Sequence, residues 1–120
     1  MSFYITLKCD KNIHELDKDY RLRGDWEVGI IKVINHSIEA PVIWIISDLV
    51  EYTNYNSIPL QILDVISTKV NQGVVNNKAS YTRVAKKRFN SINIQLKHDP
   101  ENDYDHYFYD LYLRLHFRKR

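Results

Sequence analysis

Residues 107–120 read YFYDLYLRLHFRKR and alternate between apolar and polar positions along almost their whole length. Successive side chains of a β-strand point to opposite faces of a sheet, so this alternation predicts a half-buried strand. One face would hold Tyr107, Tyr109, Leu111, Leu113, Leu115 and Phe117, and the other Phe108, Asp110, Tyr112, Arg114, His116 and Arg118. The first face is predicted to be core, which leaves the basic end Arg118-Lys119-Arg120 to be explained.

The sequence before this stretch repeats the same period. Ile92, Ile94 and Leu96 alternate with polar residues, and residues 98–103 supply turn-forming side chains around Pro100. We therefore predict that the two strands form a hairpin.

Further strands are predicted at residues 3–7, 26–34, 42–48, 60–67 and, more weakly, 79–84. Residues 42–48 are apolar on both faces, as in a strand covered from both sides, and Trp44 is expected in the core. In residues 60–67 a short helix competes with the strand, whose inward residues would be Leu60, Ile62 and Val65. Gly29 indicates a bulge or a close backbone approach.

The segments between these strands carry turn residues. Residues 8–24 lack a clear period and are predicted to form a loop or one short helix, with a turn at Gly24-Asp25. Residues 54–57 and 71–78 are predicted to be polar connections. Roughly seven or eight short strands without a dominant helix indicate an all-β, two-sheet antiparallel β-sandwich, of jelly-roll or immunoglobulin-like topology.

Size and composition set outer limits on function. The 120 residues suffice for one domain, expected to span residues 1–120. Lys and Arg number 17 against 15 Asp and Glu, so the net charge of +2 does not by itself indicate a polyanion partner. The single cysteine, Cys9, excludes an internal disulfide framework and is predicted to be buried or inert. No signal-peptide or membrane-spanning pattern occurs, so the protein is expected inside a cell or virion and not inserted in a membrane.

Two basic clusters are candidates for contacts with a polyanion or a protein partner. The first is Arg114, His116, Arg118, Lys119 and Arg120, and the second is Lys86, Lys87 and Arg88. Proteins that bind single-stranded nucleic acid place aromatic rings and cations on one surface, because stacking and phosphate contact occur together. In residues 107–120 most apolar side chains fall on the opposite face from the cations. Solvated or partner-facing clusters are therefore the competing interpretation.

Motifs for catalysis and metal binding are weak. His98, Asp99, Glu101, Asp103, Asp105 and His106 gather around one turn, but they lack the spacing of a calcium loop, and a hydrophilic hairpin tip is the simpler interpretation. No nucleophile elbow, phosphate-cradling glycine loop or zinc-protease helix is present. The sequence predicts no enzyme, cofactor or metal.

Several short blocks, taken together in order, resemble proteins of Polinton (Maverick) elements and adintoviruses. The blocks are residues 3–7 (FYITL), 24–29 (GDWEVG), 47–50 (SDLV), 89–94 (FNSINI) and 113–118 (LRLHFR). The resemblance implies a single jelly-roll minor capsid or penton-like protein that forms a homo-oligomer and contacts a major capsid protein.

The chain also departs from this pattern, because only residues 30–46 separate the second block from the third, where family members are longer. This difference weighs against a pentameric vertex role and leaves a reduced or captured copy as an alternative. A different class of function also stays open: a β-sandwich module that recognises nucleic acid or glycan through a basic aromatic face.

Overall fold

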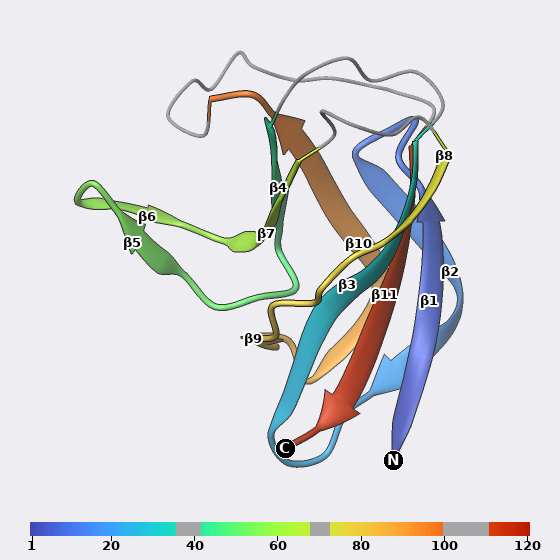
Figure 1. Ribbon diagram of the computed structural model, residues 1–120. Helices are drawn as coiled ribbons and strands as arrows, with labels where there is room; N and C mark the ends of the chain where they lie inside the picture. The colour runs from blue at the N-terminus through green and yellow to red at the C-terminus, as the bar shows by residue number, and fades with distance from the viewer. Residues whose placement is uncertain (36–41, 68–72, 100–110) are drawn as a thin grey trace.

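The computed structural model describes residues 1–35, 42–67, 73–99 and 111–120, and these residues contain strands and loops but no helix. In chain order the strands are β1 (Ser2–Lys8), β2 (Ile13–Arg21), β3 (Trp26–Asn35), β4 (Val42–Ser47), β5 (Thr53–Tyr55), β6 (Ile58–Leu60), β7 (Ile62–Ser67), β8 (Gly73–Asn76), β9 (Thr82–Arg83), β10 (Arg88–Lys97) and β11 (Leu111–Lys119). Figure 1 shows their arrangement in space.

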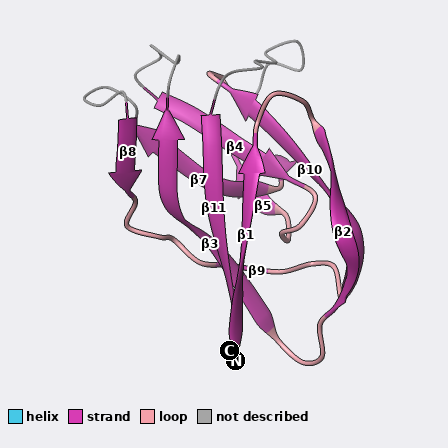
Figure 2. Cartoon of the chain, turned by 90° about the vertical axis from the view of Figure 1, so that its right-hand side faces the viewer, coloured by secondary structure: helices cyan, strands magenta, loops and turns pink. Residues whose placement is uncertain are grey.

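The strands form two antiparallel sheets. Sheet I has the order β1-β11-β3-β8, with the short β9 also paired to β3, and sheet II has the order β2-β10-β4-β7. The first and last strands lie side by side from Ser2↔Arg118 to Lys8↔Tyr112, which brings both chain ends to one end of the sandwich (Figure 2). The predicted all-β, two-sheet antiparallel sandwich is confirmed.

The core lies between the two sheets and follows from the period of two. In β11 the side chains of Leu111, Leu113, Leu115 and Phe117 are fully buried, as predicted for this part of residues 107–120. Phe117 stacks on Phe3 with ring centroids 4.7 Å apart, and Phe3 stacks on Tyr20 at 5.1 Å, so aromatic rings close the edge between β1 and β2. Each large apolar side chain buried here stabilises the fold by about 1.5–3 kcal/mol.

The expected strands at residues 3–7, 26–34, 42–48 and 92–97 are confirmed as β1, β3, β4 and β10. The close backbone approach expected at Gly29 is also present, because a Cβ atom there would lie 3.3 Å from the backbone oxygen of Ser80. The expected turn at Gly24-Asp25 places Gly24 at φ +85°, a conformation that glycine adopts readily.

Residues 8–24 were expected to be a loop or a short helix, and this prediction is wrong, because β2 occupies Ile13–Arg21. The strand alternates, but its inward positions include the polar rings of His14 and Tyr20, which hide the period from a hydrophobicity pattern. Apart from the exposed Ile13, charged side chains fill its outward positions, as is common on edge strands, where charges discourage pairing with other chains.

The predicted hairpin between the last two long strands is also wrong. β10 pairs with β2 and β4 in sheet II, whereas β11 pairs with β1 and β3 in sheet I. The alternation identifies each strand correctly, but it carries no information about which strand lies beside which. The expected turn around Pro100, and the expected positions of residues 106–110, lie outside the described residues.

The strand predicted at residues 60–67 is present as β7 from residue 62 onward, with a different inward face, and Leu60 belongs to β6. Leu63 and Ile66 are buried, whereas Val65 is exposed and Leu60 and Ile62 are only half-buried. The pairing of β7 with β4 passes from Asp64↔Ile45 to Ile62↔Ile46, so Leu63 is an extra residue in a bulge that shifts the alternation.

Three further expectations need correction. The polar connection expected at residues 71–78 contains β8, which pairs with the end of β3. The strand expected at residues 79–84 is reduced to β9 and one bridge between Val84 and Val50. Trp44 is not in the core, because it points outward from sheet II, where Tyr55 of the β5–β6 hairpin contacts it edge-on at 5.0 Å.

The turn expected at residues 54–57 is confirmed as the tip of the β5–β6 hairpin. Its two central residues, Asn56 and Ser57, have φ values of 49° and 67°. Positive φ at both positions is what a two-residue hairpin of type I′ requires. The hairpin projects from the side of the sandwich (Figure 1).

Candidate functional site

The outward face of sheet I carries three of the predicted site residues. Because the inward residues of β11 are core, Arg114, His116 and Arg118 must point away from it, and Arg114 and Arg118 are exposed. The edge strand β1 adds Tyr4 to the same face, in register with His116. The structure therefore brings aromatic rings and cations together on this face, although the sequence had suggested that they were largely separated.

These side chains form one continuous stack. The guanidinium carbon of Arg114 lies 4.6 Å from the centre of the Tyr4 ring, and the Tyr4 and His116 rings are stacked at 4.7 Å. Tyr81 contacts His116 edge-on, and the Arg118 guanidinium carbon lies 3.5 Å from the centre of the Tyr81 ring. The three rings thus contact one another and the two arginines. These contacts restrain the positions of the two guanidinium groups.

Gly29 explains how Tyr81 reaches this stack. Gly29 is opposite His116 in the β3–β11 register, and a Cβ atom there would lie 3.2 Å from Cδ1 of Tyr81. Without that atom, Tyr81 can cross β3, and its hydroxyl oxygen lies 2.7 Å from Nδ1 of His116 in a hydrogen bond. Burial, followed by the charge of Arg118, lowers the pKa of His116 below its ordinary value, so the ring is neutral at neutral pH.

Arg118 and Arg120 share one carboxylate as an ion-pair partner. The Nε atom of Arg118 lies 2.6 Å from Oε1 of Glu27, and that of Arg120 lies 3.6 Å from Oε2. Glu27 is the register partner of Arg118 on β3. The basic tip of the chain is therefore partly an intramolecular ion-pair cluster and not an open cationic surface.

The remaining predicted cations lie around the β2–β3 turn or on the β9–β10 connection. Lys87 donates a hydrogen bond to the carbonyl of Gly24, and the side chain of Lys119 packs against the same glycine. Nζ of Lys86 lies 2.5 Å from Oδ2 of Asp48, and Nε of Arg88 lies 2.8 Å from Oδ2 of Asp19. The run Lys86-Lys87-Arg88 is thus engaged by oxygen atoms of the protein, which weakens the polyanion interpretation of this cluster.

One shallow depression on sheet I contains cations without a carboxylate. It measures about 180 Å³ and is lined by Thr6, Lys32, Ile34, Tyr112 and Arg114. Arg114 is the register partner of Lys32 on one side and of Thr6 on the other, so the three stand in one row across three strands. Within the described part of the chain, neither Lys32 nor Arg114 forms an ion pair.

Sequence reasoning missed Lys32. The signal was present, because Lys32 is the only charged residue within the apolar run from Val28 to Ile34. A lone charge on a central strand must point away from the core. Its neighbour across the sheet, however, is set by the β3–β11 register, and this register shifts at a bulge between Arg114 and Leu115.

The outward face of sheet II is different where β4 and β7 form it, because that part is apolar. Trp44 and Val65 are register partners there, as are Ile46 and Ile62. Val65 is 40% exposed and Val42, at the start of β4, is 41% exposed. We call Val42, Trp44, Ile46, Ile62 and Val65 the apolar face. The β5–β6 hairpin continues it with Tyr55, which touches Trp44, and with the exposed Ile58.

The turn after β4 is held by a satisfied polar network. The Ser47 hydroxyl accepts a hydrogen bond from the amide of Leu49, and Oδ1 of Asp48 accepts one from the amide of Asn93. The side-chain amide of Gln61 donates to the carbonyl of Val50 at 2.9 Å. Since Leu49 and Val50 are fully buried, residues 47–50 have a structural explanation in the fold itself.

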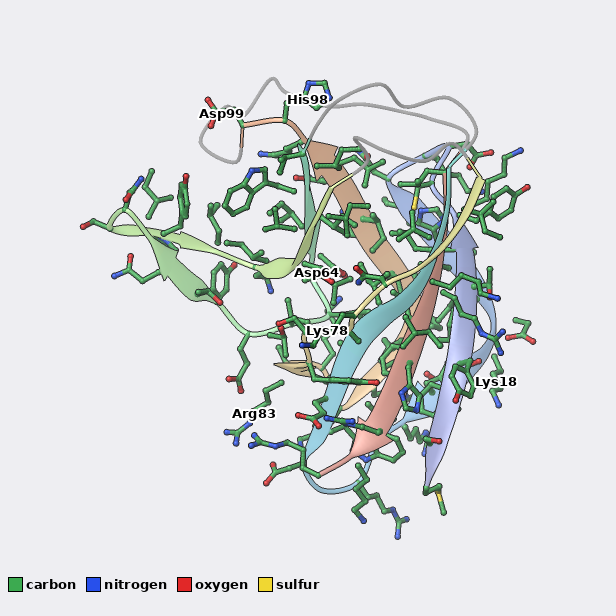
Figure 3. The ribbon with its side chains drawn as sticks, viewed as in Figure 1. Lys18, Asp64, Lys78, Arg83, His98 and Asp99 are labelled. Atoms are coloured by element: carbon green, nitrogen blue, oxygen red, sulfur yellow. The ribbon has the colours of Figure 1, made fainter. Side chains whose placement is uncertain are left out.

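A second buried polar contact ties the two sheets together. Asp64 of β7 accepts a hydrogen bond from the side-chain amide of Asn77, which also donates to the carbonyl of Ile30 in β3. Figure 3 shows Asp64 between these strands, with Lys78 nearby. Burial raises the pKa of the Asp64 carboxyl above its ordinary value, and the hydrogen bonds from Val65 and Asn77 oppose that rise.

Two hollows lie at the end of the sandwich that holds both termini. Two adjoining grooves of about 330 and 290 Å³ share Met1, Arg21 and Trp26 in their linings. Asp19 lies 3.6 Å from Arg21, so this cation has an acidic partner. We see no set of catalytic groups in these grooves.

Cys9 is buried, as predicted, and burial with a smaller effect of Asp10 raises its pKa to about 12. A thiol in this state is not a nucleophile at neutral pH.

Among the described residues, no group of three or more His, Cys, Asp and Glu side chains could hold a metal ion. His98 and Asp99 lie at the end of β10 (Figure 3), and the other members of that predicted cluster lie outside the described residues. No helix in the described residues is long and apolar enough to cross a membrane.

Comparisons with known proteins give no relative. No protein-family model matches the chain, and no significant match was found among curated proteins or among solved structures.

Proposed function

We propose that this chain is a small single jelly-roll structural module of virion or virus-derived origin that works by assembling with copies of itself. A role beside a major capsid protein belongs to the same proposal. Its support is of two kinds, the path of the chain through the sandwich and the chemistry of one outward face.

The strand order supports the jelly-roll assignment. A jelly roll is a double sheet of eight strands built from two Greek keys. Without the β5–β6 hairpin and β9, eight strands remain, and the chain passes between sheets I and II at every step except from β4 to β7. The first and last strands are then neighbours in sheet I. The five sequence blocks fall on β1, β3, β10, β11 and the turn after β4, which are one edge strand, three of the four central strands and a buried turn.

The observation that carries the self-assembly proposal is the apolar face of sheet II. Soluble monomers rarely leave large contiguous apolar patches in water, and such patches mark protein–protein interfaces. Here Trp44 and Ile46 stand outward on β4 beside Val65 and Ile62 on β7. Large aromatic and aliphatic side chains of this kind supply most of the binding energy in interfaces.

Light scattering after size-exclusion chromatography tests the proposal. We expect a closed oligomer for the wild type and a shift to monomer for Val65→Lys, because a charge buried in an apolar interface is costly. Ile13→Lys on the edge strand β2 is the matched control, since Ile13 is 56% exposed and β10 separates its strand from β4. A wild type that stays monomeric at high concentration, or an oligomer that Val65→Lys leaves unchanged, would contradict the proposal.

The alternative function, recognition of nucleic acid or glycan through a basic aromatic face, has less support. Such recognition needs open aromatic faces for stacking. On sheet I, the Tyr4 ring lies between Arg114 and His116, and the Tyr81 ring is covered by Arg118. Most of the cations proposed for that role also have acidic partners within the protein.

A further inference from the structure

We propose that the depression formed by Thr6, Lys32, Ile34, Tyr112 and Arg114 is a binding site for the phosphate group of a small phosphomonoester. This site is independent of the proposed assembly role, because it lies on the outward face of sheet I and the apolar face lies on sheet II.

The charge of the depression is what distinguishes it from the other basic clusters. Arg118, Arg120, Lys86 and Arg88 each have a carboxylate within 4 Å, whereas Lys32 and Arg114 have none among the described residues. Side chains directly opposite one another on neighbouring strands stand about 5 Å apart at Cβ. The two cations are therefore neighbours across the strands, and an anion bound between them would offset their mutual repulsion.

The donors suit a phosphate. A guanidinium group can donate two parallel hydrogen bonds to two phosphate oxygens, and an ammonium group adds a compact positive charge. Thr6 is the register partner of Arg114, so its hydroxyl group supplies a further donor in the same row across the sheet. Stacking on Tyr4, itself held by His116, restrains the guanidinium group before a ligand arrives, so less conformational freedom is lost on binding.

Size and surroundings favour a small ligand over a polymer. A volume of about 180 Å³ accommodates a phosphate with part of a sugar, and Ile34 and the Tyr112 ring offer an apolar wall for the remainder. A nucleic-acid strand would need a continuous cationic track. Along β11 that track is interrupted at Arg118, which pairs with Glu27.

The test is a titration of the whole chain with inorganic phosphate and, separately, with ribose 5-phosphate. The low-salt buffer contains no other phosphate, and amide chemical shifts in NMR spectra report binding. We expect saturable shifts at Thr6, Lys32 and Arg114, and tighter binding of the sugar phosphate. Arg114→Gln and Lys32→Gln should each weaken binding about tenfold or more, because each removes a charge-assisted contact. Thermal melts establish that both variants are folded, as expected for substitutions on an outward face.

Two control variants remove matched charges elsewhere. Arg88→Gln and Lys86→Gln should leave the affinity unchanged, because these cations lie outside the depression and have acidic partners. Absence of saturable shifts, or shifts that persist in Arg114→Gln and Lys32→Gln, would overturn the proposal. Tight binding of a single-stranded oligonucleotide of ~10 nucleotides, without binding of ribose 5-phosphate, would overturn it in favour of a nucleic-acid site.

Discussion

The strands β11 and β4 occupy interior positions in opposite sheets and differ in their outward faces. Both bury alternate apolar residues completely, such as Leu115 in β11 and Ile45 in β4. Outward, β11 presents Arg114 and His116, whereas β4 presents Trp44 and Ile46. The outer side of β11 therefore carries charged and aromatic side chains, and the outer side of β4 carries apolar ones.

This difference shows why the two faces lead to different proposals. Cations and neutral rings on an outward face are stable in water and are suited to a small charged ligand. When another surface covers apolar side chains on an outward face, the free energy of the system falls by roughly 25 cal/mol per Å² of buried apolar area. Substitutions on each strand test this contrast.

The largest effect is expected on the inward face of β11. Leu115→Ala should lower the free energy of unfolding by about 2–5 kcal/mol, because it leaves a cavity beside a fully buried side chain. Arg114→Ala, one residue earlier on the exposed face, should change it by less than about 1 kcal/mol. Chemical denaturation of both variants measures the difference, and similar losses would contradict the assignment of the two faces.

On β4 the outward face should also matter for stability. Trp44→Ala should lower the free energy of unfolding by roughly 1–3 kcal/mol, because the ring is half-buried and contacts Tyr55. The control Tyr52→Ala, at a side chain that is 69% exposed, should have almost no effect. A Trp44→Ala variant as stable as Tyr52→Ala would indicate that the hairpin does not cover this ring.

The pH dependence of stability should also distinguish β11 from β4, because the outward face of β11 contains a histidine. Burial lowers the pKa of His116, and of His14 on β2, below the ordinary value of 6.5. The unfolded chain therefore takes up protons first as the pH falls through 6.5, and stability decreases with acidification. Melting temperatures between about pH 7.5 and about pH 5.5 should fall less for His116→Gln than for the wild type. Equal slopes would mean that His116 titrates normally. Asp64 has the opposite effect on the pH dependence of stability, and this effect is the same in the wild type and in His116→Gln.

The smallest effect is expected at the ion pair between Arg118 and Glu27. A double-mutant cycle with Arg118→Ala and Glu27→Ala should give a coupling energy of about 0.2–1 kcal/mol, because water screens the exposed arginine. A coupling well above that range would show that the stack over Tyr81 makes this pair much more rigid than an ordinary surface ion pair.

Much of the fold was predictable from local patterns. The period of two located β1, β10 and β11, and continuous β-branched or apolar runs located β3 and β4. The same rule missed β2, whose inward residues include His14 and Tyr20, and it assigned the wrong inward face to β7, where a bulge adds Leu63. Of the candidate site, Arg114 was found from the sequence and Lys32 was not, because a register between distant strands brings them together.

The sequence by itself therefore determined the class of structure and the orientation of most side chains, since alternation along a strand is a local property of the backbone. The tertiary structure decided which strands are neighbours, and with it which charges have partners. It placed β10 and β11 in different sheets, gave Arg118 a carboxylate in Glu27, and left Lys32 and Arg114 side by side without one among the described residues. Those outcomes depend on contacts between residues far apart in the chain, which no local pattern encodes.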